Sequence, residues 1–113
     1  MKKKKITIQG VDYPVVFDMQ AMLNFESIAN KSFLGNDFHL TRDRIALIVG
    51  AVIAADEDTE ITVEKVVGNK DFQAVKEIIE AYNTIMSLAE DFFDIPNVEP
   101  KDETQGEEED KKN

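Results

Sequence analysis

The sequence contains no cysteine and no tryptophan, and it has a single histidine among its 113 residues. Without cysteine the chain can form neither a disulfide, nor a thiolate zinc site, nor a cysteine nucleophile. A domain that has no disulfide framework fits a reducing compartment. We therefore expect the chain to work in the cytoplasm.

Long apolar runs are also missing from the sequence. Residues 2–5 are all lysine, but residues 6–10 do not continue into the roughly 7–15 apolar residues of a signal peptide. The most apolar segment, residues 45–55, is shorter than the roughly 20 residues that a membrane span requires. The sequence therefore predicts neither secretion nor a membrane span, and it favours a buried helix at 45–55.

Positive charge is scarce relative to negative charge. The chain has 13 lysines and arginines against 23 aspartates and glutamates, which gives a net charge of −10. Such an excess repels phosphate backbones and anionic membranes, so neither nucleic acid nor a membrane is an expected partner. A basic protein surface is compatible with this charge.

Residues that could support chemistry are few. His39 has no nucleophile beside it in the sequence, and no serine lies in a glycine-flanked turn. The acidic residues 56–60 are spaced like the start of a calcium loop, but Ile61 occupies the sixth position, where glycine is needed. Val67 occupies the twelfth position, where a bidentate glutamate is needed. The sequence thus predicts no enzyme, no cofactor and no metal site; a small acidic metal-binding or enzymatic protein remains an alternative.

The N-terminal segment has the pattern of a β-hairpin. Residues 4–8 and 13–17 are rich in β-branched and aromatic side chains, and between them Gly10 is free to adopt a positive φ. Pro14 has no N–H, so we expect it on an outward or edge position of the hairpin. These features predict a hairpin over residues 4–17.

Helix starts follow one pattern three times in the rest of the chain. A capping residue stands directly after one apolar residue and four positions before another, as a hydrophobic staple requires. The caps are Asp18, Thr41 and Thr62. The predicted helices cover about residues 19–29, 42–55, 63–67 and 71–93. Within the second of them, Gly50 predicts that a neighbouring helix passes close to the backbone.

These elements predict an α+β fold that is mainly α, with an N-terminal hairpin followed by three to four helices. Residues 1–95 are expected to form a single globular domain. Residues 96–113 carry many acidic side chains and almost no apolar ones, so we expect a disordered acidic tail there.

The predicted helix at 71–93 is apolar over an unusually wide sector. Its apolar residues fall in three rows with a spacing of seven, which is broader than the seam between two helices. Some of the apolar residues in this sector, together with phenylalanines near the helix ends, belong either to the core or to a surface that binds a protein. The candidate protein-binding residues are Phe25, Phe33, Phe38, Ile78, Ile85, Met86, Phe92 and Phe93.

Several segments of the chain resemble the tail assembly chaperones of long-tailed phages and prophages. Residues 6–19, ITIQGVDYPVVFDM, are similar to the opening of that family, where a hairpin with a Gly-containing turn and a Tyr-Pro leads into a helix. Phe25-Glu26 and residues 30–33 resemble the end of that first helix, and residues 61–66 resemble the family's small third helix. The likeness extends over about residues 5–93.

The resemblance implies a function without catalysis. Members of the family bind the long tape measure protein and keep it soluble while tail-tube subunits polymerise around it. For this chain it implies the tape measure protein as client, tail-tube subunits as further partners and the bacterial host cytoplasm as location. A self-assembling phage structural protein or head–tail accessory, forming a homo-oligomer, is the alternative.

Overall fold

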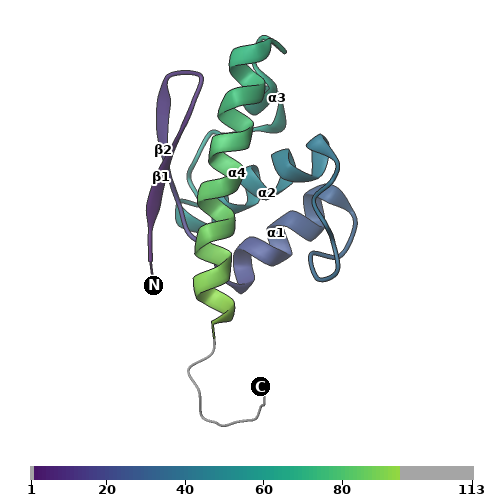
Figure 1. Ribbon diagram of the computed structural model, residues 1–113. Helices are drawn as coiled ribbons and strands as arrows, with labels where there is room; N and C mark the ends of the chain where they lie inside the picture. Colours follow the sequence, from purple (N-terminus) through teal and green to yellow (C-terminus); the bar gives the residue numbers. More distant parts are fainter. Residues whose placement is uncertain (1, 95–113) are drawn as a thin grey trace, which may run out of the picture.

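The computed structural model describes residues 2–94, which form a hairpin followed by four helices, in the order β1–β2–α1–α2–α3–α4 (Figure 1). Most of these residues are helical, so the predicted α+β, mainly α, class is confirmed. The tail predicted at 96–113 lies outside the described residues.

The hairpin consists of β1 (Lys4–Ile8) and β2 (Val11–Val15), which pair antiparallel with Ile6 opposite Tyr13. At its tip Gln9 and Gly10 have φ values of 53° and 77°. Two successive left-handed residues are the geometry of the turns that match the twist of paired strands. The hairpin was therefore predicted correctly, but its second strand, expected at residues 13–17, begins and ends two residues earlier.

Helix α2 (Thr41–Ala55) runs through the centre of the domain beside α1 (Met19–Ala29). A Cβ added to Gly50 would lie 3.0 Å from the backbone nitrogen of Phe25 and 3.3 Å from the carbonyl oxygen of Ala21. Asn24 bridges the same crossing, because its side-chain amide donates to the Gly50 carbonyl oxygen at 3.0 Å. The predicted close approach of a neighbouring helix at Gly50 is confirmed.

Two of the three predicted helix caps are confirmed. The side chain of Asp18 accepts from the Ala21 N–H at 2.9 Å, and the Thr62 hydroxyl accepts from the Lys65 N–H at 3.1 Å. The prediction for Thr41 is wrong, because this residue is already helical and the N-cap is Leu40, which makes no side-chain cap bond.

The loop before α2 explains this difference. Arg44 Nε donates to the Phe38 carbonyl oxygen at 2.8 Å and thereby fixes the chain just before the helix. The Leu40 carbonyl oxygen then accepts from the N–H groups of Asp43 and Arg44, at 3.1 and 3.3 Å. The backbone turn thus starts one residue earlier than the sequence pattern indicates.

The remaining helices are α3 (Val63–Val67) and α4 (Phe72–Phe93), which is capped by the Asp71 side chain. Helix α4 runs along the whole domain, with the hairpin on one side and α1 and α2 on the other (Figure 1). None of the helices in the described part of the chain has the length and hydropathy that a bilayer crossing requires.

Candidate protein-binding surface

Five of the eight side chains predicted to bind a protein belong to the core of the domain. Their burial corrects the prediction, since a side chain enclosed by its own chain offers no contact area to a partner. The phenylalanines among them pack on one another between α1 and the loop that follows it, and the isoleucines face inward from α4. These five residues are Phe25, Phe33, Phe38, Ile78 and Ile85.

Phe92 and Phe93, at the C-terminal end of α4, lie on the surface instead, with exposed fractions of 43% and 45%. Both rings contact Phe17, with centroids at 5.5 and 5.9 Å, and the Phe93 ring stacks on Phe33 at 6.3 Å. The two phenylalanines are therefore the open edge of an aromatic cluster whose other rings are buried. Because the buried rings already hold this edge in place, little conformational entropy is lost when a partner covers Phe92 and Phe93.

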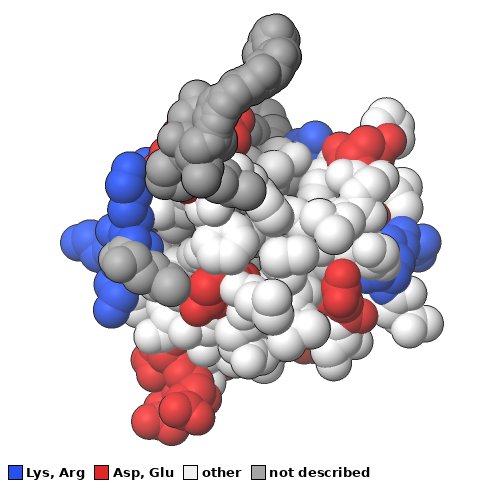
Figure 2. All heavy atoms as spheres, turned by 90° about the horizontal axis from the view of Figure 1, so that it is seen from below, with Lys and Arg blue, Asp and Glu red and all other residues white. Residues whose placement is uncertain are grey.

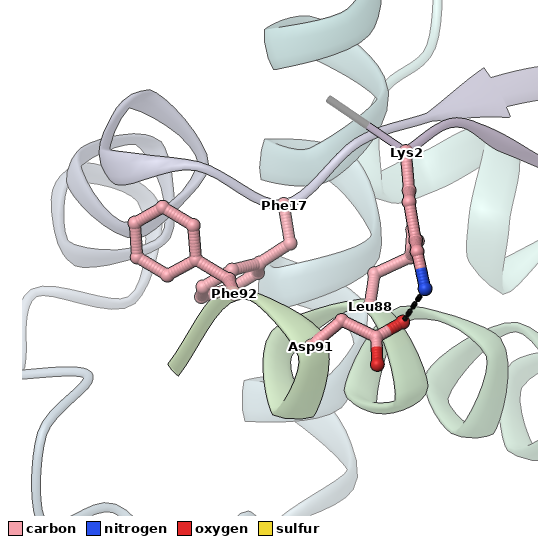
Figure 3. A pocket seen from close by; sticks show the side chains of 5 residues that line it. All are labelled: Lys2, Phe17, Leu88, Asp91 and Phe92. Atoms are coloured by element: carbon pink, nitrogen blue, oxygen red, sulfur yellow. Dashed lines mark hydrogen bonds and ion pairs between the residues drawn. The ribbon is translucent and has the colours of Figure 1, made fainter. Parts of the chain in front are cut away.

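Beside this edge lies a shallow hollow of about 200 Å³ (Figure 3). Its apolar wall comes from Phe17, which precedes α1, and from Leu88 and Phe92 of α4. Its polar wall is an ion pair, in which Lys2 Nζ lies 2.9 Å from Asp91 Oδ2. The hollow could accept one apolar side chain with a polar group close by.

Helix α4 carries a second apolar face besides the face that packs into the core. The core face contains Ala74, Ile78, Ala81, Ile85, Leu88 and Ala89. On another side of the helix, a row of five apolar residues begins at Phe72, and its members are alternately three and four positions apart. A sixth apolar residue follows seven positions after the fifth. We call this set the outer row of α4; it consists of Phe72, Val75, Ile79, Tyr82, Met86 and Phe93.

The outer row is covered in its middle and open toward both ends. Phe38 packs on the Tyr82 ring at 5.7 Å, and the Arg44 guanidinium lies 4.5 Å from the centre of the same ring. Toward the N-terminal end of α4, by contrast, Phe72, Val75 and Ile79 are 80%, 47% and 44% exposed. Of the eight predicted residues, Met86 is half-buried within this row and Phe93 ends it.

Exposed apolar residues on α1 and its loop were not predicted from the sequence. Met19, Leu23 and Leu34 are exposed, and the first two are four residues apart on one face of α1. The spacing of four residues between Met19 and Leu23 was the sequence signal that could have indicated an exposed apolar face, but a pair of residues that faces the core has the same spacing. Figure 2 shows that residues without charge fill much of the face at the end where α4 terminates, with acidic groups within the face and at its border and basic groups toward its edges.

The residues considered for catalysis and for calcium take part in local turns. His39 is exposed in the loop before α2, where its N–H donates to Asp37 Oδ1 at 2.9 Å. In the acidic loop, Asp56 Oδ1 accepts from the Asp58 N–H at 3.0 Å, so this carboxylate closes a local turn. Within residues 2–94 no group of three or more His, Asp or Glu side chains is placed to hold a metal ion.

Comparison of the chain with protein-family models, with curated proteins and with solved structures gives no match.

Proposed function

We propose that this chain is a phage tail assembly chaperone, which binds the tape measure protein and keeps it soluble in the bacterial cytoplasm while the tail assembles. The observation that carries the proposal is the exposed apolar surface: the open parts of the outer row and of the aromatic cluster lie on one small acidic domain. Large exposed apolar patches in a folded protein mark sites of protein contact. The identity of the client, the tape measure protein, comes from the sequence segments that resemble the chaperone family.

A chaperone of this kind needs apolar area for its client and a charged remainder that keeps the complex in solution. The chain has both, because its net charge is −10 while residues such as Phe72 and Phe93 remain open. A high net charge of one sign opposes aggregation through repulsion between complexes.

The test is co-expression with a tape measure protein from the genome that encodes this chain. We expect the tape measure protein to remain in the soluble fraction and to elute together with this chain during size exclusion. A matched control replaces this chain with an unrelated acidic domain of similar size. Precipitation of the tape measure protein to the same extent in both experiments would refute the proposal.

Self-assembly into a structural component is the competing function, since the same apolar surface could bind a second copy. Sedimentation of the purified chain over a wide concentration range separates the two. A chaperone is expected as a monomer or small oligomer, whereas rings or tubes formed in isolation would support the structural role.

A further inference from the structure

We propose that the outer row of α4 is the docking seam for one amphipathic helix of the client, a helix whose apolar residues repeat in heptads and whose flanking residues are basic. This inference rests on the proposed function and deepens it, because it names the surface and the chemistry of the segment that binds there.

The spacing of the row indicates a helical ligand. From Phe72 to Met86 the apolar residues alternate between separations of three and four, which is the pattern of a coiled-coil seam. Phe38 and Arg44 cover Tyr82, so the open part of this pattern runs from Phe72 to Ile79. At a rise of about 1.5 Å per residue, these seven steps are roughly 10 Å long, which matches about two turns of a partner helix. An extended strand would instead need an open row of backbone groups, and a helix such as α4 bonds these groups internally.

The charge beside the row favours a basic partner. Three exposed carboxylates lie next to the row in the helical spacing, against one exposed lysine. These groups are Asp71, Glu90 and Asp94, and Lys76. The exposed carboxylates of Glu80 and Asp91 lie instead on the side of α4 that faces β1 and Lys2. The three carboxylates next to the row can attract lysines or arginines beside the apolar row of a client. A second copy of this chain would instead bring like charges together.

The area of the row also favours a client over a stable dimer. An aromatic side chain buries on the order of 150–250 Å² and an aliphatic one somewhat less, so the open parts of Phe72, Val75 and Ile79 amount to roughly 300 Å². A stable interface buries about 800 Å² on each partner. A row of this size suits binding that is reversible, as a chaperone that must release its client requires.

The first experiment uses the full chain and synthetic 21-residue helical peptides. One peptide has leucine at both apolar heptad positions and lysine at the flanking positions; a second has glutamate at the flanking positions. We expect the lysine peptide to bind in a fluorescence anisotropy titration, and the glutamate peptide to bind more weakly by on the order of tenfold. Equal binding of the two peptides, or no binding of the lysine peptide, would overturn the inference.

Matched variants locate the contact. Ile79→Glu places a carboxylate in the row, and Leu23→Glu places one at a position on α1 that is 51% exposed. We expect Ile79→Glu to weaken binding of the lysine peptide by on the order of tenfold and Leu23→Glu to leave it unchanged. Circular dichroism verifies that each variant is folded, and Val75→Glu replaces Ile79→Glu if the latter is not. An equal effect of the row and α1 variants contradicts the inference.

The same variants separate this inference from the proposed function. If the parent chain keeps the tape measure protein soluble and folded Ile79→Glu does so equally well, the chaperone function stands and the seam is wrong. If the peptide binds at the row but the tape measure protein still precipitates, the seam stands and the proposed client is wrong.

Discussion

At the scale of single residues, position 50 requires glycine because α1 and α2 cross closely there. Replacing glycine with alanine inside a helix normally gains up to about 1 kcal/mol of helix stability. Here the added Cβ would stand 3.0 Å from the Phe25 backbone nitrogen and 3.1 Å from Asn24 Cβ, so α1 and α2 would have to separate. Overpacking of this kind costs about 1–3 kcal/mol.

We therefore predict that Gly50→Ala lowers the free energy of unfolding, by up to about 2 kcal/mol after the gain in helix propensity is subtracted. Urea denaturation followed by circular dichroism measures this change. An increase in the free energy of unfolding would mean that the two helices are farther apart than the structure places them.

Asp43 is a buried carboxylate, 3% exposed, in the first turn of α2. Its Oδ2 atom lies 3.2 Å from Lys31 Nζ and 3.5 Å from Asn36 Nδ2, so it ties the loop after α1 to α2. The sequence places an acidic residue in the first turn of a helix, where it is favourable while exposed. Its burial follows from the path of that loop, which no local pattern reveals.

The variant Lys31→Met tests this tie. It leaves the buried Asp43 carboxylate without its cation, and we expect a loss of about 1–2 kcal/mol in the free energy of unfolding. This is less than for a fully buried ion pair, because Lys31 is partly exposed to solvent. The control is Lys65→Met, since Lys65 pairs with Glu60 at 3.7 Å on the surface. That change should cost less than about 0.5 kcal/mol. Equal losses in the two thermal or urea titrations would contradict the assignment.

At the scale of elements, the bounds of all four helices could be predicted to within one residue, and those of the second strand to within two. Their signals are local: Gly10 at a turn of positive φ, Asp18 and Thr62 as caps, and Gly68 after α3. Thr41 shows the limit of this reasoning, because Arg44 fixes the loop through a contact that depends on tertiary structure. A capping pattern identifies the start of a helix to within a residue, and packing decides the rest.

Alanine substitutions at the caps test this distinction. Thr62→Ala removes an observed capping bond, and we expect it to lower the free energy of unfolding by about 1 kcal/mol. Thr41→Ala removes no capping bond, so its effect should stay within about 0.5 kcal/mol. Losses of equal size in urea titrations would show that Thr41 caps α2 in solution.

The candidate site could be predicted only in part, for a similar reason. The heptad rows of α4 show that the helix is apolar on several sides, but they do not show which side a neighbour covers. The structure buries Ile78 and Ile85 and opens Val75 and Ile79, although all four are aliphatic residues of one helix. Only the positions of the hairpin, α2 and the loop after α1 separate the two groups.

At the scale of the whole molecule, the excess of negative charge governs how a client approaches. Attraction between oppositely charged surfaces raises association rates and is screened by salt over a Debye length of about 10 Å at 0.1 M. We predict that the association rate constant for the lysine peptide falls by on the order of tenfold between 50 mM and 500 mM sodium chloride. Stopped-flow fluorescence measures it, and a rate that does not change with salt would show that charge has no part in recognition.

The contact of β1 with α4 also affects how the protein is made. The hairpin leaves the ribosome before the helices, and the helix against which β1 packs is synthesised after every other described element. Until α4 emerges, the inward side chains Ile6 and Ile8 lack part of their native cover, and pairing across so long a sequence separation is slow to form. The nascent chain thus exposes the inward side chains of β1 through most of its synthesis, and their native burial must follow translation of α4.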